Sequence, residues 1–194
     1  MFDYSINDSE RAVDMMLKGI DFMEPSSLAG TEETTEYIFY TNTYYHLGLA
    51  YMMKGDLLNA RRAFNDLLDV AVNDDHIIMS VYWNYIILKR LGYEEDAKEA
   101  LKHIKPDMNC PVSGGYYECL KMYTGEIEPE EIISETSEDD QLGLVTSGFG
   151  VANEYQFRGE YERYVELLEK VLETNAWSGF GYLSAEVDMK RIRG

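Results

Sequence analysis

The chain has 194 residues, of which 45% are hydrophobic and 13% aromatic, and it contains only 4 prolines. This composition supplies a sizeable core and argues against general disorder. The formal net charge of −19 at pH 7 opposes binding to nucleic acid or to anionic lipid. The first residues carry no basic region, and no apolar run approaches the ~18 residues of a membrane span. We therefore expect a cytoplasmic protein without a signal peptide.

The first predicted element is a helix over residues 9–22, where Ala12 and Met16 lie on one side. The clearest loop of the chain follows at residues 24–30, which contain proline, two serines and a glycine. This helix lacks an obvious partner before it. Two interpretations remain open: it caps the N-terminal end, or the chain is part of a longer protein.

A well-marked helix pair is predicted over residues 41–74. Its first helix carries Tyr44, Leu47, Gly48 and Tyr51 on one stripe, and the second carries Ala60, Phe64, Leu67 and Leu68. The turn Gly55-Asp56 separates them. This order of a large aromatic residue, Leu-Gly, Tyr, a Gly-Asp turn, Ala and Phe resembles the tetratricopeptide repeat (TPR) family. Val72 stands where that family has its closing proline.

Glycines support a repeat of this kind along the chain. Gly55, Gly92, Gly125 and Gly159 are spaced by 37, 33 and 34 residues, and each lies between two apolar-periodic segments. Such a position suits the end of a helix, where the backbone needs a positive φ that glycine adopts without penalty.

The other pairs match the TPR pattern less closely. In the second, over residues 78–108, Asn84-Tyr85 replaces Leu-Gly while Ala97 and Leu101 keep the pattern. A degenerate repeat follows at 113–136, in which Glu128-Pro129 predicts a helix start. The fourth spans 137–174, with Ser137 to Asp140 as a capping box and Tyr164 in the slot of a small residue. The tetrapeptide Ser-Gly-Phe-Gly occurs at 147–150 and at 178–181, each time predicted to lead into a helix, and the second copy introduces a capping helix over 178–193.

The resemblance implies an all-α fold: a single domain, residues 1–194, in which antiparallel helix hairpins stack into an α-solenoid with a right-handed superhelix. In this family the first helices of the hairpins line a concave groove that holds a segment of a partner protein. The residues that the resemblance places in the groove are Tyr45, Leu49, Met52, Met53, Tyr82, Ile86, Lys89, Arg90, Phe149, Asn153 and Phe157. This set is aromatic and Met-rich, which suits apolar anchors. The alternative interpretation is that neighbouring helices or a self-associating face bury these side chains.

No catalytic or metal-binding pattern is present in the sequence. The three histidines, at 46, 76 and 103, are far apart and form no HExxH pair. Cys110 and Cys119 fit no CxxC motif, which predicts two thiols in a reducing compartment, or a disulfide if the chain is secreted. We therefore expect no enzyme, no cofactor and no metal.

Acidic residues concentrate in two segments. Residues 1–40 contain nine acidic and two basic residues, and residues 105–140 contain ten and two, whereas the remaining segments are nearly balanced. These segments are where a basic partner would dock. We predict a protein-protein interaction module or scaffold; the alternative is a structural or oligomerisation subunit of a larger complex or enzyme, and self-association stays open.

Overall fold

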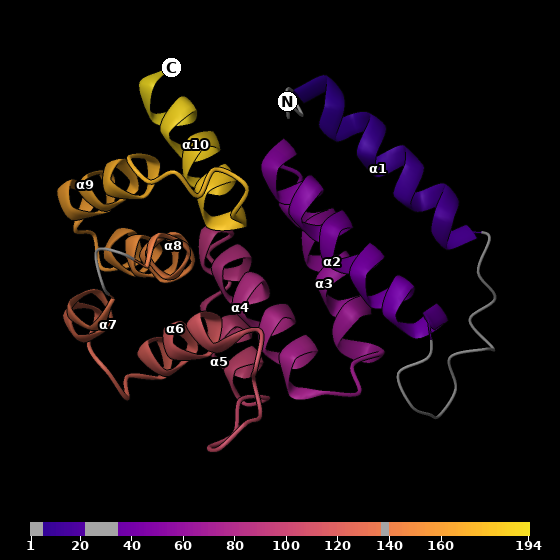
Figure 1. Cartoon of the computed structure of the whole chain (residues 1–194), viewed down its shortest axis with the longest axis horizontal. Helices are drawn as coiled ribbons and strands as arrows, with labels where there is room; N and C mark the ends of the chain where they lie inside the picture. Colours follow the sequence, from indigo (N-terminus) through magenta and orange to yellow (C-terminus); the bar gives the residue numbers. More distant parts are fainter. Residues whose placement is uncertain (1–5, 22–34, 137–139) are drawn as a thin grey trace. The chain divides into compact units, whose positions relative to one another are not determined.

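The computed structural model describes residues 6–21, 35–136 and 140–194, and all regular secondary structure in these ranges is α-helical (Figure 1). The chain forms two compact units, residues 1–109 and 110–194. The sequence did not predict this division. An all-helical fold, by contrast, was expected from the periodicity and is confirmed for the described residues.

Unit 1 contains the helices α1 (Ile6–Asp21), α2 (Thr35–Lys54), α3 (Leu57–Asp69), α4 (Asp74–Arg90) and α5 (Glu94–Leu101). Helix α2 contacts α1, α3 and α4, and α4 contacts α3 and α5, so sequential helices lie side by side (Figure 1). The predicted first repeat began at residue 41, but α2 already begins at Thr35. The helix is longer because Tyr37 and Tyr40 are buried and continue its apolar face.

The centre of unit 1 is an aromatic cluster on three helices. Phe64 of α3 is fully buried and stacks on Trp83 of α4, with ring centroids 6.2 Å apart and an interplanar angle of 11°. Tyr45 of α2 meets the Phe64 ring edge-on at 6.2 Å. Gly48 permits this approach, since a Cβ there would lie 2.7 Å from two Phe64 ring carbons. The TPR-like Gly and Phe positions are therefore in direct contact.

The turn from α3 to α4 is closed without the proline that the TPR pattern expects. The backbone N–H of Val72 donates to the Tyr37 hydroxyl at 2.8 Å, which also hydrogen-bonds His76 Nδ1 at 3.0 Å. Asn73 caps α4 by accepting from the His76 N–H at 2.9 Å. A buried tyrosine of α2 thus holds the exit turn in place of a rigid residue.

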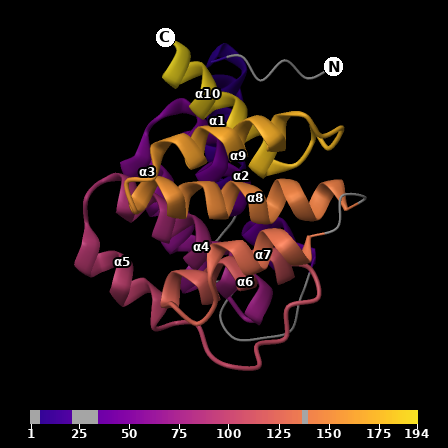
Figure 2. The same ribbon diagram turned by 90° about the vertical axis from the view of Figure 1, so that its left-hand side faces the viewer.

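Unit 2 contains the helices α6 (Gly114–Thr124), α7 (Pro129–Glu135), α8 (Gln141–Phe157), α9 (Tyr161–Leu172) and α10 (Phe180–Arg193). Helix α8 is central, because it contacts α6, α7, α9 and α10, and Figure 2 shows α9 on one side of it and α6 and α7 on the other. The C-terminal helix α10 packs on both α8 and α9.

The four repeated glycines have the predicted geometry. Gly55, Gly92, Gly125 and Gly159 have φ angles of +86°, +76°, +83° and +81°. At Gly92, Gly125 and Gly159 a Cβ would meet no atom within 4 Å. Glycine is required at these three turns by the left-handed backbone alone.

Two local predictions in unit 2 were wrong. The capping box was predicted over Ser137 to Asp140, but the N-cap of α8 is Asp140, whose carboxylate accepts from the Gly143 N–H at 2.9 Å. Residues 137–139 lie outside the described ranges. The first Ser-Gly-Phe-Gly copy lies within α8 rather than before a helix. There Gly148 permits close packing, since a Cβ would come within 2.9 Å of Val171 on α9.

Candidate functional site

The structure buries most of the residues that were predicted to line a groove. Three partly exposed side chains lie in unit 1, namely Met53, Lys89 and Arg90, and one lies in unit 2, Phe157. The remaining seven are buried: Tyr45, Leu49, Met52, Tyr82, Ile86, Phe149 and Asn153. This burial corresponds to the alternative interpretation, in which neighbouring helices cover these side chains. Partner binding by this set stays a prediction.

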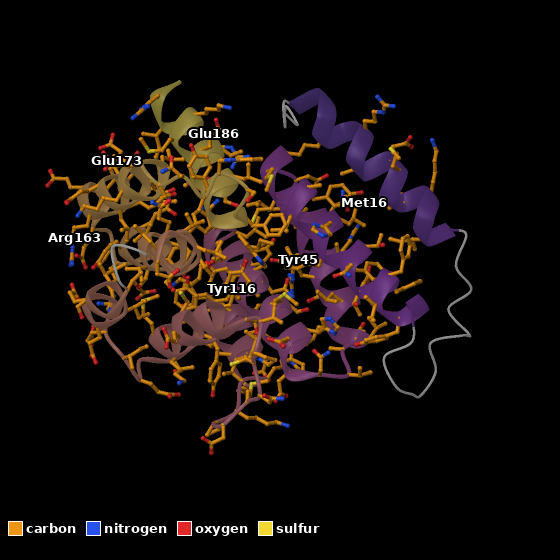
Figure 3. The ribbon with its side chains drawn as sticks, in the orientation of Figure 1. Met16, Tyr45, Tyr116, Arg163, Glu173 and Glu186 are labelled. Carbon is orange, nitrogen blue, oxygen red and sulfur yellow. The ribbon has the colours of Figure 1, made fainter. Side chains whose placement is uncertain are left out.

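Buried members of the set have identifiable structural roles. Tyr45 packs against Phe64 and lies among the side chains of unit 1 in Figure 3. Tyr82 meets the neighbouring Trp83 edge-on at 5.1 Å. Asn153 donates through Nδ2 to the Phe149 carbonyl one turn earlier, at 2.8 Å. These contacts stabilise the core and the helices themselves.

The partly exposed members share a position in the fold. Met53 is in the last turn of α2, and Lys89 and Arg90 are in the last turn of α4, so each precedes a glycine turn. Lys89 Nζ lies 2.5 Å from Glu94 Oε2 at the start of α5. Cations are favourable at this end of a helix. In unit 1 the accessible part of the predicted surface is therefore confined to these helix ends.

A cleft in unit 2 lies between α7, α8 and α9 and has a volume of about 330 Å³. Arg163 lies 3.9 Å above the ring of Tyr155 and its guanidinium donates to Glu130 at 2.5 Å and to the Tyr155 hydroxyl at 2.6 Å. Figure 3 labels Arg163 on α9. The hydrogen bond from Arg163 holds the pKa of Glu130 below its usual range. This cluster links three helices, and none of its three residues was among the predicted site residues.

Two arginines, one directly after α8 and one on α9, partly neutralise the acidic segment predicted to receive a basic partner. Arg158 lies 3.3 Å from Glu128, and Arg163 is paired with Glu130. These side chains are at least a third exposed, so each pair contributes little to stability. The acidity of this part of unit 2 is therefore lower than the sequence count indicates.

A second cleft, in unit 1, lies between α3, α4 and α5 and has a volume of about 220 Å³. We call it the Asn84 cleft. Its apolar lining includes Leu68, Val81 and Leu88, and its polar lining includes Arg61, Asn65, Asn84, Asp96, Glu99 and His103. Asn84 is 3% exposed and donates through Nδ2 to Asn65 Oδ1 at 2.9 Å. None of the described residues donates a hydrogen bond to Asn84 Oδ1.

The sequence did contain a signal for this cleft. Asn84 interrupts an otherwise apolar stretch of α4, at a position where the TPR pattern has leucine. A polar side chain in such a stretch is costly to bury unless it has a hydrogen-bond partner.

Two potentially reactive side chains, Cys119 and His46, have shifted pKa values. Cys119 is fully buried, its thiol lies 3.7 Å from the Ser147 carbonyl, and burial raises its pKa, which disfavours the nucleophilic thiolate. Desolvation lowers the pKa of His46. In the described ranges no three His, Cys, Asp or Glu side chains are grouped to hold a metal ion.

No described helix is both long and apolar enough to cross a membrane. Comparison with models of protein families, with curated proteins and with solved structures found no match to this chain.

Proposed function

We propose that the protein is a non-enzymatic binding module of TPR-like helix hairpins that holds a segment of a partner protein. The observation that carries this proposal is the repeated hairpin geometry: four glycines with nearly equal positive φ angles separate paired helices. The contact between Gly48 and Phe64 supports it further, because these two residues occupy matching positions of the TPR pattern. The proposal includes stacking of the hairpins into a solenoid.

The partner-contacting surface in unit 1 is proposed to be the partly exposed helix ends rather than the full predicted groove. Met53 offers an adaptable apolar contact near the end of α2, and Lys89 and Arg90 offer cations in the last turn of α4, in the same unit. An apolar side chain flanked by a carboxylate is the kind of segment that these groups would bind. Buried members of the set would position this surface without touching the partner.

Site-specific photo-crosslinking tests the proposal. A photoreactive amino acid at position 53 is expected to crosslink the protein to a polypeptide partner in its native extract. The matched control is the same amino acid at Leu58, which is 54% exposed on α3 and lies outside the proposed surface. Equal crosslinking from both positions, or none from position 53, would contradict the proposed surface.

The alternative of an oligomerisation subunit has an observation in its favour. Exposed apolar side chains occur on α1, at Met15 and Leu17, and near the start of α2, at Ile38 and Phe39. Such side chains can belong to an interface between copies. Light scattering and the crosslinking experiment together separate the two functions. A stable oligomer in light scattering, with crosslinks from position 53 that join only copies of this chain, would favour the alternative.

A further inference from the structure

The end of unit 2 where α8 begins carries two exposed apolar side chains, Leu142 and Trp177, which are 61% and 63% exposed. We call these two residues the Trp177 patch. We propose that the patch binds a cationic segment of a partner protein, in which an apolar side chain is flanked by lysine or arginine. This surface is separate from the one proposed on unit 1, and the segment that it binds has the opposite charge.

The two side chains belong to neighbouring segments. The loop that joins α9 to α10 is attached to the start of α8 on both sides of Trp177. Before the tryptophan, the Asn175 N–H donates to Gln141 Oε1 at 2.9 Å. After it, a Cβ on Gly179 would lie 3.7 Å from Leu142 Cδ1. Figure 2 shows this loop and the start of α8 at the same end of the unit. Leu142 and Trp177 therefore form one apolar surface and are not isolated exposed residues.

Trp177 lies on a turn whose backbone is fixed. The Gly179 N–H donates to the Ala176 carbonyl at 2.9 Å, so Trp177 is a central residue of a tight turn. Before this turn, Thr174 Oγ1 donates to the Val171 carbonyl at 2.8 Å. No hydrogen bond, ring contact or cation from the described part of the chain engages the Trp177 side chain. Its ring and its indole N–H are therefore available to a partner, and the fixed turn reduces the entropy lost on binding.

Acidic side chains at this end of the unit favour a cationic partner. Glu173 is the C-cap of α9, in the same loop as Trp177, and Asp140 is the N-cap of α8, two residues before Leu142. Both are exposed, and no base in the described ranges is paired with either. A lysine or arginine of the partner could pair with these carboxylates or lie over the indole ring, which is the aromatic side chain that attracts cations most strongly.

A second copy of this chain would fit the patch less well. Unit 2 contains seventeen acidic and seven basic residues. All seven bases already lie against an acidic or aromatic side chain of the same unit. Two copies would therefore bring like charges together at the patch.

Fluorescence anisotropy of a dye-labelled model peptide, titrated with the full chain, tests the proposal. The probe is an amphipathic peptide of leucine and lysine. One control peptide has glutamate in place of every lysine, and the other contains lysine alone at equal charge. We expect saturable binding of the leucine–lysine peptide and at least tenfold weaker binding of both controls, because the patch combines apolar and anionic groups.

Matched variants locate the binding. Leu142 and Leu58 are each the second residue of a helix and are 61% and 54% exposed. Leu142→Ala should weaken binding of the leucine–lysine peptide about fivefold, and Leu58→Ala should leave it unchanged. Trp177→Ala should weaken it at least tenfold. Glu173→Gln should weaken it about two- to threefold, whereas Glu162→Gln, at the start of the same helix, makes the same charge change and should have no effect.

Equal effects of the two leucine variants, or a control peptide that binds as tightly as the probe, would overturn the proposal. A dimer in light scattering that Trp177→Ala dissociates would also overturn it, because a second copy would then cover the patch. Crosslinking from position 53 reports on unit 1, so a failure at the Trp177 patch is distinguishable from a failure of the proposed function.

Discussion

Replacing Gly48 by alanine should destabilise unit 1, although alanine is the better helix former. A Cβ at this position would lie 2.7 Å from Cε2 and Cζ of Phe64, well inside the ~3.5–4.0 Å of a favourable carbon contact. Phe64 has little room to move, because Trp83 stacks on one side and Tyr45 meets its edge. Overpacking a core typically costs about 1–3 kcal/mol, and this geometry favours the upper end. The higher helix propensity of alanine offsets about 1 kcal/mol of this cost, so we expect the free energy of unfolding to fall by about 2 kcal/mol.

Tryptophan fluorescence can follow unit 1 separately in urea. The chain has 2 tryptophans: Trp83 is fully buried and Trp177 is 63% exposed. In a Trp177→Phe background, the unfolding signal comes from Trp83 alone. The matched control is Gly19→Ala in α1, where a Cβ would meet only Phe39, at 4.0 Å. This control should be neutral or should stabilise by up to about 1 kcal/mol.

A double-mutant cycle isolates the contact. Phe64→Leu removes ring atoms that the new methyl group would meet, so Gly48→Ala should cost less in that background, with a coupling of about 1 kcal/mol or more. The reasoning would be refuted if Gly48→Ala and Gly19→Ala changed the free energy of unfolding equally. It would also be refuted if the cost of Gly48→Ala were the same with leucine at position 64.

Three further outcomes are expected. Gly125→Ala should destabilise unit 2 by about 1–2 kcal/mol in urea unfolding, because Gly125 has a left-handed φ of +83°. Gly114→Ala is the control and should not destabilise the unit, because φ is not left-handed there and a Cβ also meets no atom within 4 Å. The pKa of Glu130 is lowered chiefly by Arg163. The stabilisation by this pair is therefore present above the unfolded pKa of about 4.3 and is lost as the pH falls through the folded pKa of Glu130. An NMR titration should show the pKa of Glu130 rising in Arg163→Gln but not in Lys98→Gln. Cys119 should react with a thiol reagent only on unfolding, since it is fully buried with a raised pKa, and rapid modification of Cys119 under native conditions would show that unit 2 opens easily.

The turn glycines could be predicted from the sequence because their physical requirement is local. A helix that ends in a left-handed residue favours glycine at that position. The spacing of the glycines in the sequence located four such residues, and all four have positive φ. Gly48 and Phe64 were likewise assigned to the repeat pattern from the sequence, and their contact follows the complementarity of a missing Cβ and a large ring. Both features depend on a few residues in one hairpin.

The burial of the predicted groove residues, by contrast, could not be predicted from the sequence. Helix α4 is apolar around most of its circumference, and its residues from Ser80 to Leu88 are all buried. A helix of this kind has no polar face to show which side meets solvent. Tyr82 and Ile86 fit a groove and a core equally well by periodicity, and only the packing of neighbouring helices decides between them.

Large and small side chains are paired between helices both where the chain follows the TPR pattern and where it departs from it. In the first hairpin, Gly48 on α2 receives the ring of Phe64 on α3. In the fourth pair the large residue is Tyr164, which stands in the slot of a small one and is nevertheless buried. Its hydroxyl donates to the buried carboxylate of Asp188 on α10 at 3.1 Å. A tyrosine suits this slot because the next helix supplies a polar acceptor; the same ring in the slot of Ala60 would lack the acceptor that α10 provides. The residue that breaks the repeat thus makes a hydrogen bond to the C-terminal helix.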